Sequence, residues 1–272
     1  MKTHLFKLEC LTDLHVGNGE ANYSIIDNEV QKDTVLEDVP VIHASGVKGA
    51  LKDHFEKVEK WSEEKIRKVF GGIEKYETNE IDLVTKQKKK KSRTVEGQYK
   101  FFGAFCAARP LRVSDGSCPY ILCTSEDVLE HLSELLFGLD FEGFYQYEQL
   151  EFNDQKFLST DSLEIEGEST GILNNSSVKG FSKFGWDKFA VAKSLRDYAL
   201  PVRARNALDD NGQSKNLWYE EIVPHKSIFY FVVITPDGEC MLEFEAGKPV
   251  QFGGNASIGN GYTTIKEVIL DE

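Results

Sequence analysis

Long hydrophobic runs and paired cysteines are both missing from this chain. Its longest apolar run, Ile228–Ile234, is far too short to cross a bilayer, and the N-terminal segment MKTHLFKLEC has no apolar stretch typical of a secretory signal. The five cysteines include no CxxC pair, and their odd number argues against a disulfide scaffold or a zinc ribbon. These absences predict reduced thiols, a cytoplasmic location and no membrane partner.

Common enzyme signatures are missing as well. The sequence contains no Walker A motif, no HExxH and no GxSxG, and Asn22 stands where a dinucleotide fingerprint needs a third glycine after Gly17 and Gly19. A metal-dependent enzyme acting on small molecules stays open as an alternative. It would be expected to show a denser cluster of His, Asp and Glu than this chain has.

Positive charge is scarce overall but concentrated locally. The chain has 32 Lys+Arg against 45 Asp+Glu, and its net charge of −13 argues against a free-standing nucleic-acid binder. However, residues 125–170 hold 13 acidic residues and one lysine, while residues 85–100 hold seven basic residues and one glutamate. The acidic stretch is a candidate outer or subunit-facing surface, and a protein-interaction module that uses it is another alternative.

The pattern of apolar residues predicts one elaborated α+β domain over residues 1–272, with an antiparallel sheet and long functional loops. Strands are predicted at 3–11, 227–235, 239–246 and 262–270, the middle two as a hairpin around Asp237 and Gly238. Helices are predicted at 47–60, 63–70, 125–137 and 186–200, the first three with N-caps at Ser45, Ser62 and Ser125. Residues 72–98, with a lysine run, are expected to form an exposed basic loop.

The first candidate site is the polar loop at residues 12–33, which contains His15 and Asp27. A carboxylate in such a loop could accept a proton or hold a divalent ion, and oxygen ligands suit Mg²⁺. The alternative is structural, with His15 capping a turn and Asp27 solvated.

Two further segments could hold a phosphate backbone. In HASGVKGALK (43–52), a helix start with Ser45, Lys48 and Lys52 could bind an anion; otherwise it is an ordinary capped helix with solvent-facing lysines. In FGGNASIGNGY (252–262), four glycines in nine residues indicate positive φ angles or close backbone approach; otherwise the segment is a wide turn.

Basic residues recur at two more places. Arg203 and Arg205 precede an adjacent acid pair, Glu220 and Glu221, which could be catalytic but more often is structural. The run from Lys86 to Arg93 usually indicates a solvated loop, although it could embrace a nucleic acid.

Seven segments between about residue 7 and residue 265 follow the order of a known family. They are HVGNG (15–19), DNEVQKD (27–33), VPVIHASGVKGALK (39–52), RPLRV (109–113), LPVRAR (200–205), NLWYEE (216–221) and VQFGGNASIGNG (250–261). Together they resemble the RAMP superfamily of CRISPR-associated proteins, and within it the backbone subunit of the type III-B (Cmr) effector complex. The last two segments are the most specific, and they favour this subunit over its type III-A counterpart.

The resemblance implies a ferredoxin-like (RRM-like) core with long insertions, one of them a thumb β-hairpin that we place within residues 165–200. Copies of the chain would line up along a CRISPR guide RNA, together with other subunits, and cut complementary target RNA at regular intervals. The resemblance assigns catalysis to Asp27 and His15, both in the first loop, and a divalent ion (Mg²⁺ or Mn²⁺) to Asp27. The implied contacts to RNA backbone are Ser45, Lys48, Lys52, Arg203, Arg205, Gly253, Gly254, Asn255, Gly259 and Gly261.

A related reading is a structural RNA-binding filament subunit that does not cut, and only the competence of Asp27 separates the two. If cutting occurs, the ribose 2′-OH would attack in line, leaving 2′,3′-cyclic phosphate and 5′-OH ends.

Overall fold

The computed structural model describes residues 1–19, 25–36, 38–81, 88–115, 119–141, 163–165, 168–170, 172–174, 188–192, 195, 198–236 and 240–269. Within these ranges no helix is long and apolar enough to cross a membrane. The statements below concern these residues.

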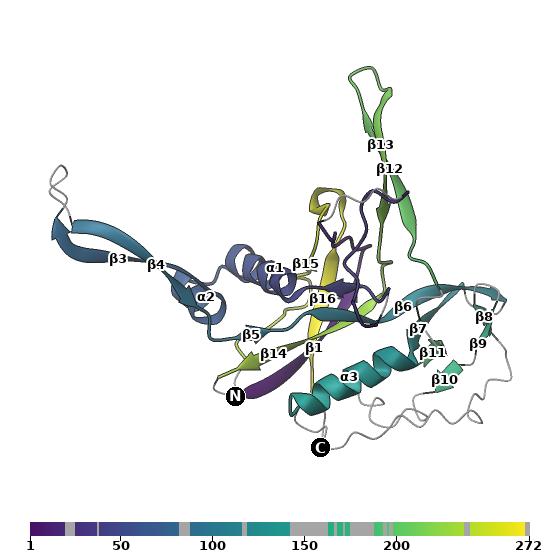
Figure 1. The fold of residues 1–272 in the computed structure, drawn as a ribbon, viewed down its shortest axis with the longest axis horizontal. Coiled ribbons are helices and arrows are strands. Elements are labelled where there is room, and N and C mark those ends of the chain that lie inside the picture. The colour runs from purple at the N-terminus through teal and green to yellow at the C-terminus, as the bar shows by residue number, and fades with distance from the viewer. Residues whose placement is uncertain are drawn as a thin grey trace.

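A large, mostly antiparallel sheet forms the centre of the molecule (Figure 1). Its strands run in the order β10-β11-β7-β6-β14-β1-β16-β15; β11 pairs with β7 in parallel, and the other neighbours in this order are antiparallel. The strands of this path are β1 (Lys2–Cys10), β6 (Ala104–Asp115), β7 (Tyr120–Ser125), β10 (Ile172–Asn174), β11 (Lys188–Ala192), β14 (Ile228–Thr235), β15 (Val250–Gln251) and β16 (Tyr262–Val268). Off the path lie β2 (Val41–Ile42), β5 (Lys100–Phe101), β8 (Leu163–Ile165) and β9 (Glu168–Thr170).

The core is built around strand β14, which lies between β1 and β6. Its sequence, IFYFVVIT, is apolar on both faces, as expected for a strand covered on both sides, and all but one of its residues are buried. The ring of Phe231 stacks on Phe6 of β1, with ring centroids 5.2 Å apart. The mixed α/β architecture with an antiparallel sheet was correctly predicted. The finer ferredoxin-like description stays a prediction.

Helices α1 (Ala44–Lys57) and α3 (Glu126–Gly138) pack on this sheet. Helix α2 (Glu63–Phe70) packs against α1 and reaches the sheet through Phe70, whose ring stacks on Phe101 of β5. The N-cap at Ser62 is confirmed, because its side chain accepts a hydrogen bond from the Lys65 N–H at 3.3 Å. The N-cap at Ser45 is wrong. Helix α1 is capped by His43, whose carbonyl accepts from the Val47 N–H at 3.0 Å, so Ser45 lies inside the first turn.

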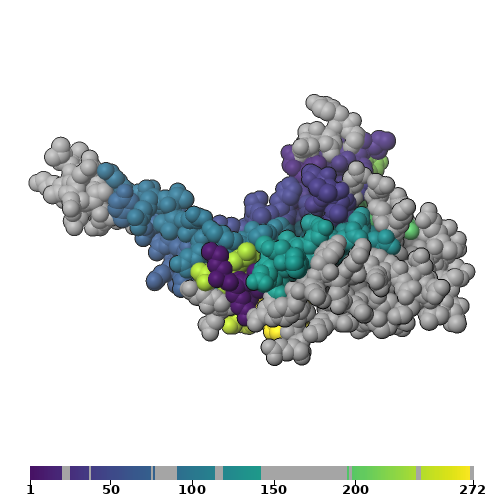
Figure 2. All heavy atoms as spheres, turned by 60° about the horizontal axis from the view of Figure 1, so that its bottom comes forward, coloured from purple at the N-terminus to yellow at the C-terminus, as the bar shows by residue number. Residues whose placement is uncertain are grey.

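Two hairpins stand away from the body (Figure 1). The first is formed by β3 (Gly71–Ile81) and β4 (Lys88–Glu96), and we call it the arm. It replaces the exposed loop expected at 72–98, and Figure 2 shows it projecting clear of the body in a second view. The other hairpin is formed by β12 (Val202–Leu208) and β13 (Ser214–Glu221).

Two sequence predictions were wrong in the second half of the chain. Residues 188–192, expected to be helical, form strand β11, which pairs with β7. Residues 240–246, expected to be a strand, lie outside the strands; there Phe244 covers Phe6 and Phe55 instead, with ring centroids 5.7 and 5.5 Å away. Tertiary packing overrides strand propensity here. The Asp237-Gly238 turn and most of the thumb region at 165–200 lie outside the described residues.

Candidate functional site

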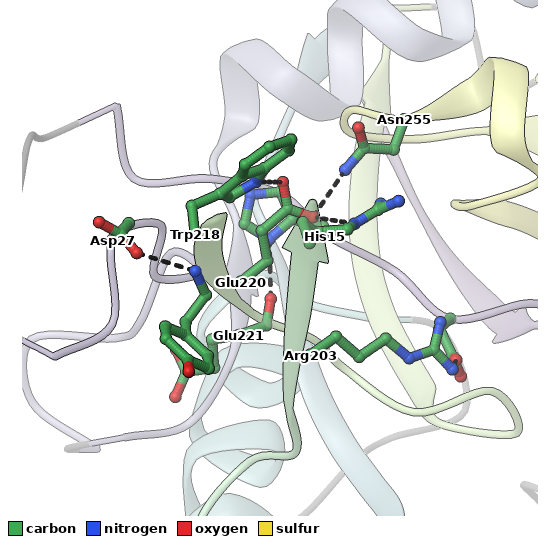
Figure 3. Close-up of polar contacts among 10 residues, drawn as sticks. His15, Asp27, Arg203, Trp218, Glu220, Glu221 and Asn255 are labelled. Carbon is green, nitrogen blue, oxygen red and sulfur yellow. Dashed lines mark hydrogen bonds and ion pairs between the residues drawn. The ribbon is translucent and has the colours of Figure 1, made fainter. Parts of the chain in front are cut away.

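Strand β13 holds Asp27 at the surface. The backbone N–H groups of Asp27 and Asn28 both donate to the Tyr219 carbonyl at 3.1 Å, and Asp27 Oδ2 accepts from the Tyr219 N–H at 2.8 Å (Figure 3). A parallel bridge between Asn28 and Glu220 continues this pairing. Tyr219 therefore holds both the backbone of Asp27 and one oxygen of its exposed carboxylate.

The same strand holds His15 two residues further along. His15 is 8% exposed, and its Nδ1 lies 2.7 Å from the carbonyl oxygen of Glu221. A carbonyl oxygen only accepts, so Nδ1 carries the hydrogen, and Nε2 is the acceptor in the neutral ring. Asp27 is bonded to Tyr219 and His15 to Glu221, and alternate residues of a strand such as these lie about 6.7 Å apart. Strand β13 therefore holds His15 and Asp27 close to each other. Within the described residues, no hydrogen bond joins their side chains.

Glu220 lies at the centre of the site (Figure 3). Its buried carboxylate accepts from Trp218 Nε1 at 2.8 Å, Arg205 Nε at 2.9 Å and Asn255 Nδ2 at 3.1 Å. Burial alone would raise the pKa of Glu220, but the hydrogen bonds from Trp218 and Arg205, with the charge of Arg205, lower it overall. Glu220 is thus an ionised clamp that joins the β12–β13 hairpin to the glycine-rich loop.

Glu221 joins β13 to the first loop. Its Oε2 accepts from the Val30 N–H at 3.2 Å, and its Oε1 lies 3.1 Å from Lys32 Nζ. Burial tends to lower the pKa of Lys32, but the hydrogen bond and charge of Glu221 outweigh burial and raise it. We call the set His15, Asp27, Glu220, Glu221 and Asn255 the β13 site.

Asp13 fixes the other side of the first loop. Its carboxylate pairs with Arg203 and accepts from the backbone N–H of His225 at 2.7 Å. Its carbonyl accepts from the Gly261 N–H at 2.8 Å. Arg203 and Arg205, both expected on RNA backbone, are therefore each paired with a carboxylate, and contact with RNA stays a prediction for both.

The glycine-rich loop contains the positive φ angles that its composition predicted. They occur at Gly253 (71°), Asn255 (63°), Gly259 (84°) and Gly261 (81°). A Cβ at Gly253 would lie 2.2 Å from the His15 carbonyl oxygen, and one at Gly261 would lie 1.9 Å from that of Phe252. These two glycines allow close approach within the chain. Gly254 and Gly259, in contrast, face open space and remain available to a ligand.

The start of α1 is joined to the first loop through Gln31. The Gln31 side chain accepts from the His43 N–H at 2.9 Å and donates to the Gly17 carbonyl at 3.1 Å. Ser45 is exposed at the first turn, and Lys48 and Lys52 are half-buried. The expected RNA contacts on α1 thus begin at a helix end that is tied to the loop of His15 and Asp27.

Asp27 fits the role of a single protein ligand for a divalent ion. Its side chain is exposed, and its Oδ2 is oriented by the Tyr219 N–H. In the parts of the chain that are described, no group of three or more His, Cys, Asp or Glu residues is arranged to hold a metal. Mg²⁺ is often bound through one or two carboxylates, with substrate phosphates and water as the remaining ligands.

Sequence reasoning missed two residues of this arrangement. Asp13 pairs with Arg203 far along the chain, and Gln31 bridges Gly17 and His43. Nothing in their local sequence distinguishes either residue from a solvated polar residue. The acid pair Glu220 and Glu221 did carry a signal, because two adjacent acids at a strand end beside Trp218 need partners if buried.

Comparison with known proteins identifies the family. The model of the RAMP superfamily matches residues 7–263. The chain belongs to the RAMP superfamily. It is 26% identical to the CRISPR system Cmr endoribonuclease Cmr4 of Pyrococcus furiosus, in an alignment covering 98% of this chain and 97% of the relative.

Solved structures show the same RAMP fold. A chain of the type III-B Cmr-beta complex bound to cognate target RNA aligns with a TM-score of 0.69 at 20% identity, covering 98% of each chain. Oligomeric Cmr4 from Pyrococcus furiosus aligns with a TM-score of 0.64 at 19% identity, covering 100% of each chain. This RAMP chain is therefore Cmr4-like over its whole length.

Proposed function

We propose that this RAMP chain is the backbone subunit of a type III-B effector complex, lines up with further copies along a CRISPR guide RNA, and cuts the paired target RNA. The single observation that carries the proposal is the exposed Asp27 carboxylate held by β13, in a chain similar throughout to a Cmr endoribonuclease. Guide RNA, target RNA and other subunits are the partners it requires.

In the proposed reaction, Asp27 accepts the proton of the ribose 2′-OH as its oxygen attacks the adjacent phosphorus in line. The bond from phosphorus to the 5′-oxygen of the next nucleotide breaks, leaving a 2′,3′-cyclic phosphate and, after protonation, a 5′-OH. A divalent ion held by Asp27 would supply charge stabilisation at the phosphate. The Tyr219 N–H orients Asp27, so little rearrangement is needed at the moment of reaction.

His15 is better suited to positioning than to proton transfer. It is buried, and its Nδ1–H is committed to the Glu221 carbonyl. Its Nε2 faces Gly17, where an added Cβ would lie only 3.2 Å away. We therefore assign His15 the role of fixing the first loop against β13, with Asp27 as the catalytic residue.

A target RNA with one 2′-deoxynucleotide at a mapped cut position tests the proposed function. The assembled complex should lose cutting at that position and keep cutting at the others. The products of the remaining cuts should carry 2′,3′-cyclic-phosphate ends. Undiminished cutting at the deoxy position would contradict 2′-OH attack. Absence of any cutting of all-RNA target by a complete, guide-loaded complex would favour the structural filament subunit.

A further inference from the structure

We infer that the arm carries a binding site of its own for single-stranded RNA, made by Tyr76, Lys91 and Arg93. This inference rests on the proposed function for its ligand class. The site lies on a hairpin separate from the β13 site, and none of the three residues contributes to that site.

The strand register places these three residues on one face of the arm. Tyr76 lies directly opposite Lys91, and Glu74 lies directly opposite Arg93. Alternate residues of a strand share a face, so all four side chains project on the same side. The Arg93 guanidinium carbon is 5.9 Å from the centroid of the Tyr76 ring, which agrees with this placement.

Among the described residues, the ring of Tyr76 is not part of the hydrophobic core. Tyr76 is 43% exposed on a hairpin that stands away from the body. Glu74 orients Arg93, because its Oε2 lies 2.6 Å from both Nε and Nη2 of the guanidinium. This single oxygen uses only some of the five N–H donors of Arg93. An exposed ring flanked by two cations is the combination on which unpaired bases stack while their phosphates are neutralised.

Charge favours an anionic ligand over a neutral one. Strand β4 reads KKKKSRTVE, with five basic residues and one acid, against three acids and one lysine on β3. The two strands together therefore carry a net charge of +2, in a chain whose net charge is −13. A purely electrostatic partner, such as an acidic surface on a second copy, would not need the ring. The Tyr76 side chain favours single-stranded RNA as the ligand, because each unpaired base offers a face that can stack on the ring.

The test is equilibrium binding of the full-length chain to a labelled oligouridine of about 20 nucleotides, longer than a typical single-strand site. Tyr76→Ala should weaken binding about 10-fold without changing the salt dependence, and Tyr76→Phe should bind like the wild type. Lys91→Gln should weaken binding about fivefold at 0.1 M salt and reduce the slope of log K against log salt by about 0.7. Lys57→Gln is the matched control, because Lys57 is an exposed lysine like Lys91 but lies on α1, away from the arm.

Equal binding by Lys91→Gln and Lys57→Gln, or full affinity in Tyr76→Ala, would overturn the inference. The inference would also be overturned if arm variants changed self-association, measured by sedimentation, but left RNA affinity unchanged. The arm would then bind a second copy of the chain and not RNA. Those outcomes leave target cutting at Asp27 untouched. Cutting that persists without Asp27 would instead refute the proposed reaction and not the arm site.

Discussion

The two hairpins that leave the body use their arginines differently. On the β12–β13 hairpin, Arg203 pairs with Asp13 of the first loop, and Arg205 pairs within the hairpin with Glu220, which also accepts from Asn255 of the glycine-rich loop. On the arm, Arg93 pairs with Glu74 of its own hairpin. The first hairpin is thus part of the fold that builds the β13 site, whereas the arm presents charge to a ligand. Changes to the first should alter stability and site geometry, and changes to the arm should alter binding alone.

The largest expected effect on the β13 side comes from Gly261→Ala. The added Cβ would lie 1.9 Å from the Phe252 carbonyl oxygen, at a φ of 81°. Gly259→Ala is the matched control, because its φ of 84° is similar but its Cβ meets open space. We expect urea unfolding to show a loss of about 1 kcal/mol for Gly259→Ala and of about 3 kcal/mol or more for Gly261→Ala. Equal losses would mean that close approach does not shape this loop.

Glu220→Gln should have the next largest effect. The glutamine offers one acceptor oxygen to donors from Trp218, Arg205 and Asn255, so at least one half-buried donor loses its partner. We expect a loss of about 2 kcal/mol in the free energy of unfolding. Glu245→Gln is the control, since Glu245 is 62% exposed. A Glu220 variant as stable as that control would show that the clamp is not structural.

The pKa of Glu220 predicts a further effect of acid. Because that pKa is lower in the folded chain than in the unfolded one, Glu220 adds stability above its unfolded pKa. This stability is lost as the pH falls through the folded pKa. Wild-type protein should therefore lose more free energy of unfolding between about pH 5 and pH 3 than Glu220→Gln does. Parallel pH profiles for the two proteins would refute the lowered pKa.

The smallest expected difference separates Arg203→Gln from Arg93→Gln. Arg203 joins β12 to the first loop, but its side chain is 52% exposed, so its loss should cost only about 0.5 kcal/mol. Arg93→Gln should leave the unfolding midpoint unchanged, since the pair it breaks lies within the arm. A larger loss for Arg93→Gln than for Arg203→Gln would reverse the contrast between the hairpins.

Local signals in the sequence predicted the parts of the molecule that depend on local chemistry. The apolar run of β14, the cap at Ser62 and the positive φ angles of the glycine-rich loop all follow from neighbouring residues. The arm was expected to be a loop because lysine-rich segments are usually solvated. The pairing of β4 with β3 depends on register across the hairpin, which no local signal gives. The bonds from Asn255 to Glu220 and from Arg203 to Asp13 could not be predicted, because each joins residues far apart in the chain.

Target cutting by a complex assembled with Asp27→Ala tests the central claim most directly. Assembly and guide binding should be unchanged, because among the described residues the Asp27 side chain accepts just one bond, from the Tyr219 N–H, and it is exposed. The single-turnover rate of cutting should fall by about 10² to 10⁴, as expected on removal of a general base. A wild-type rate in a fully assembled Asp27→Ala complex would contradict the assignment of catalysis to this carboxylate.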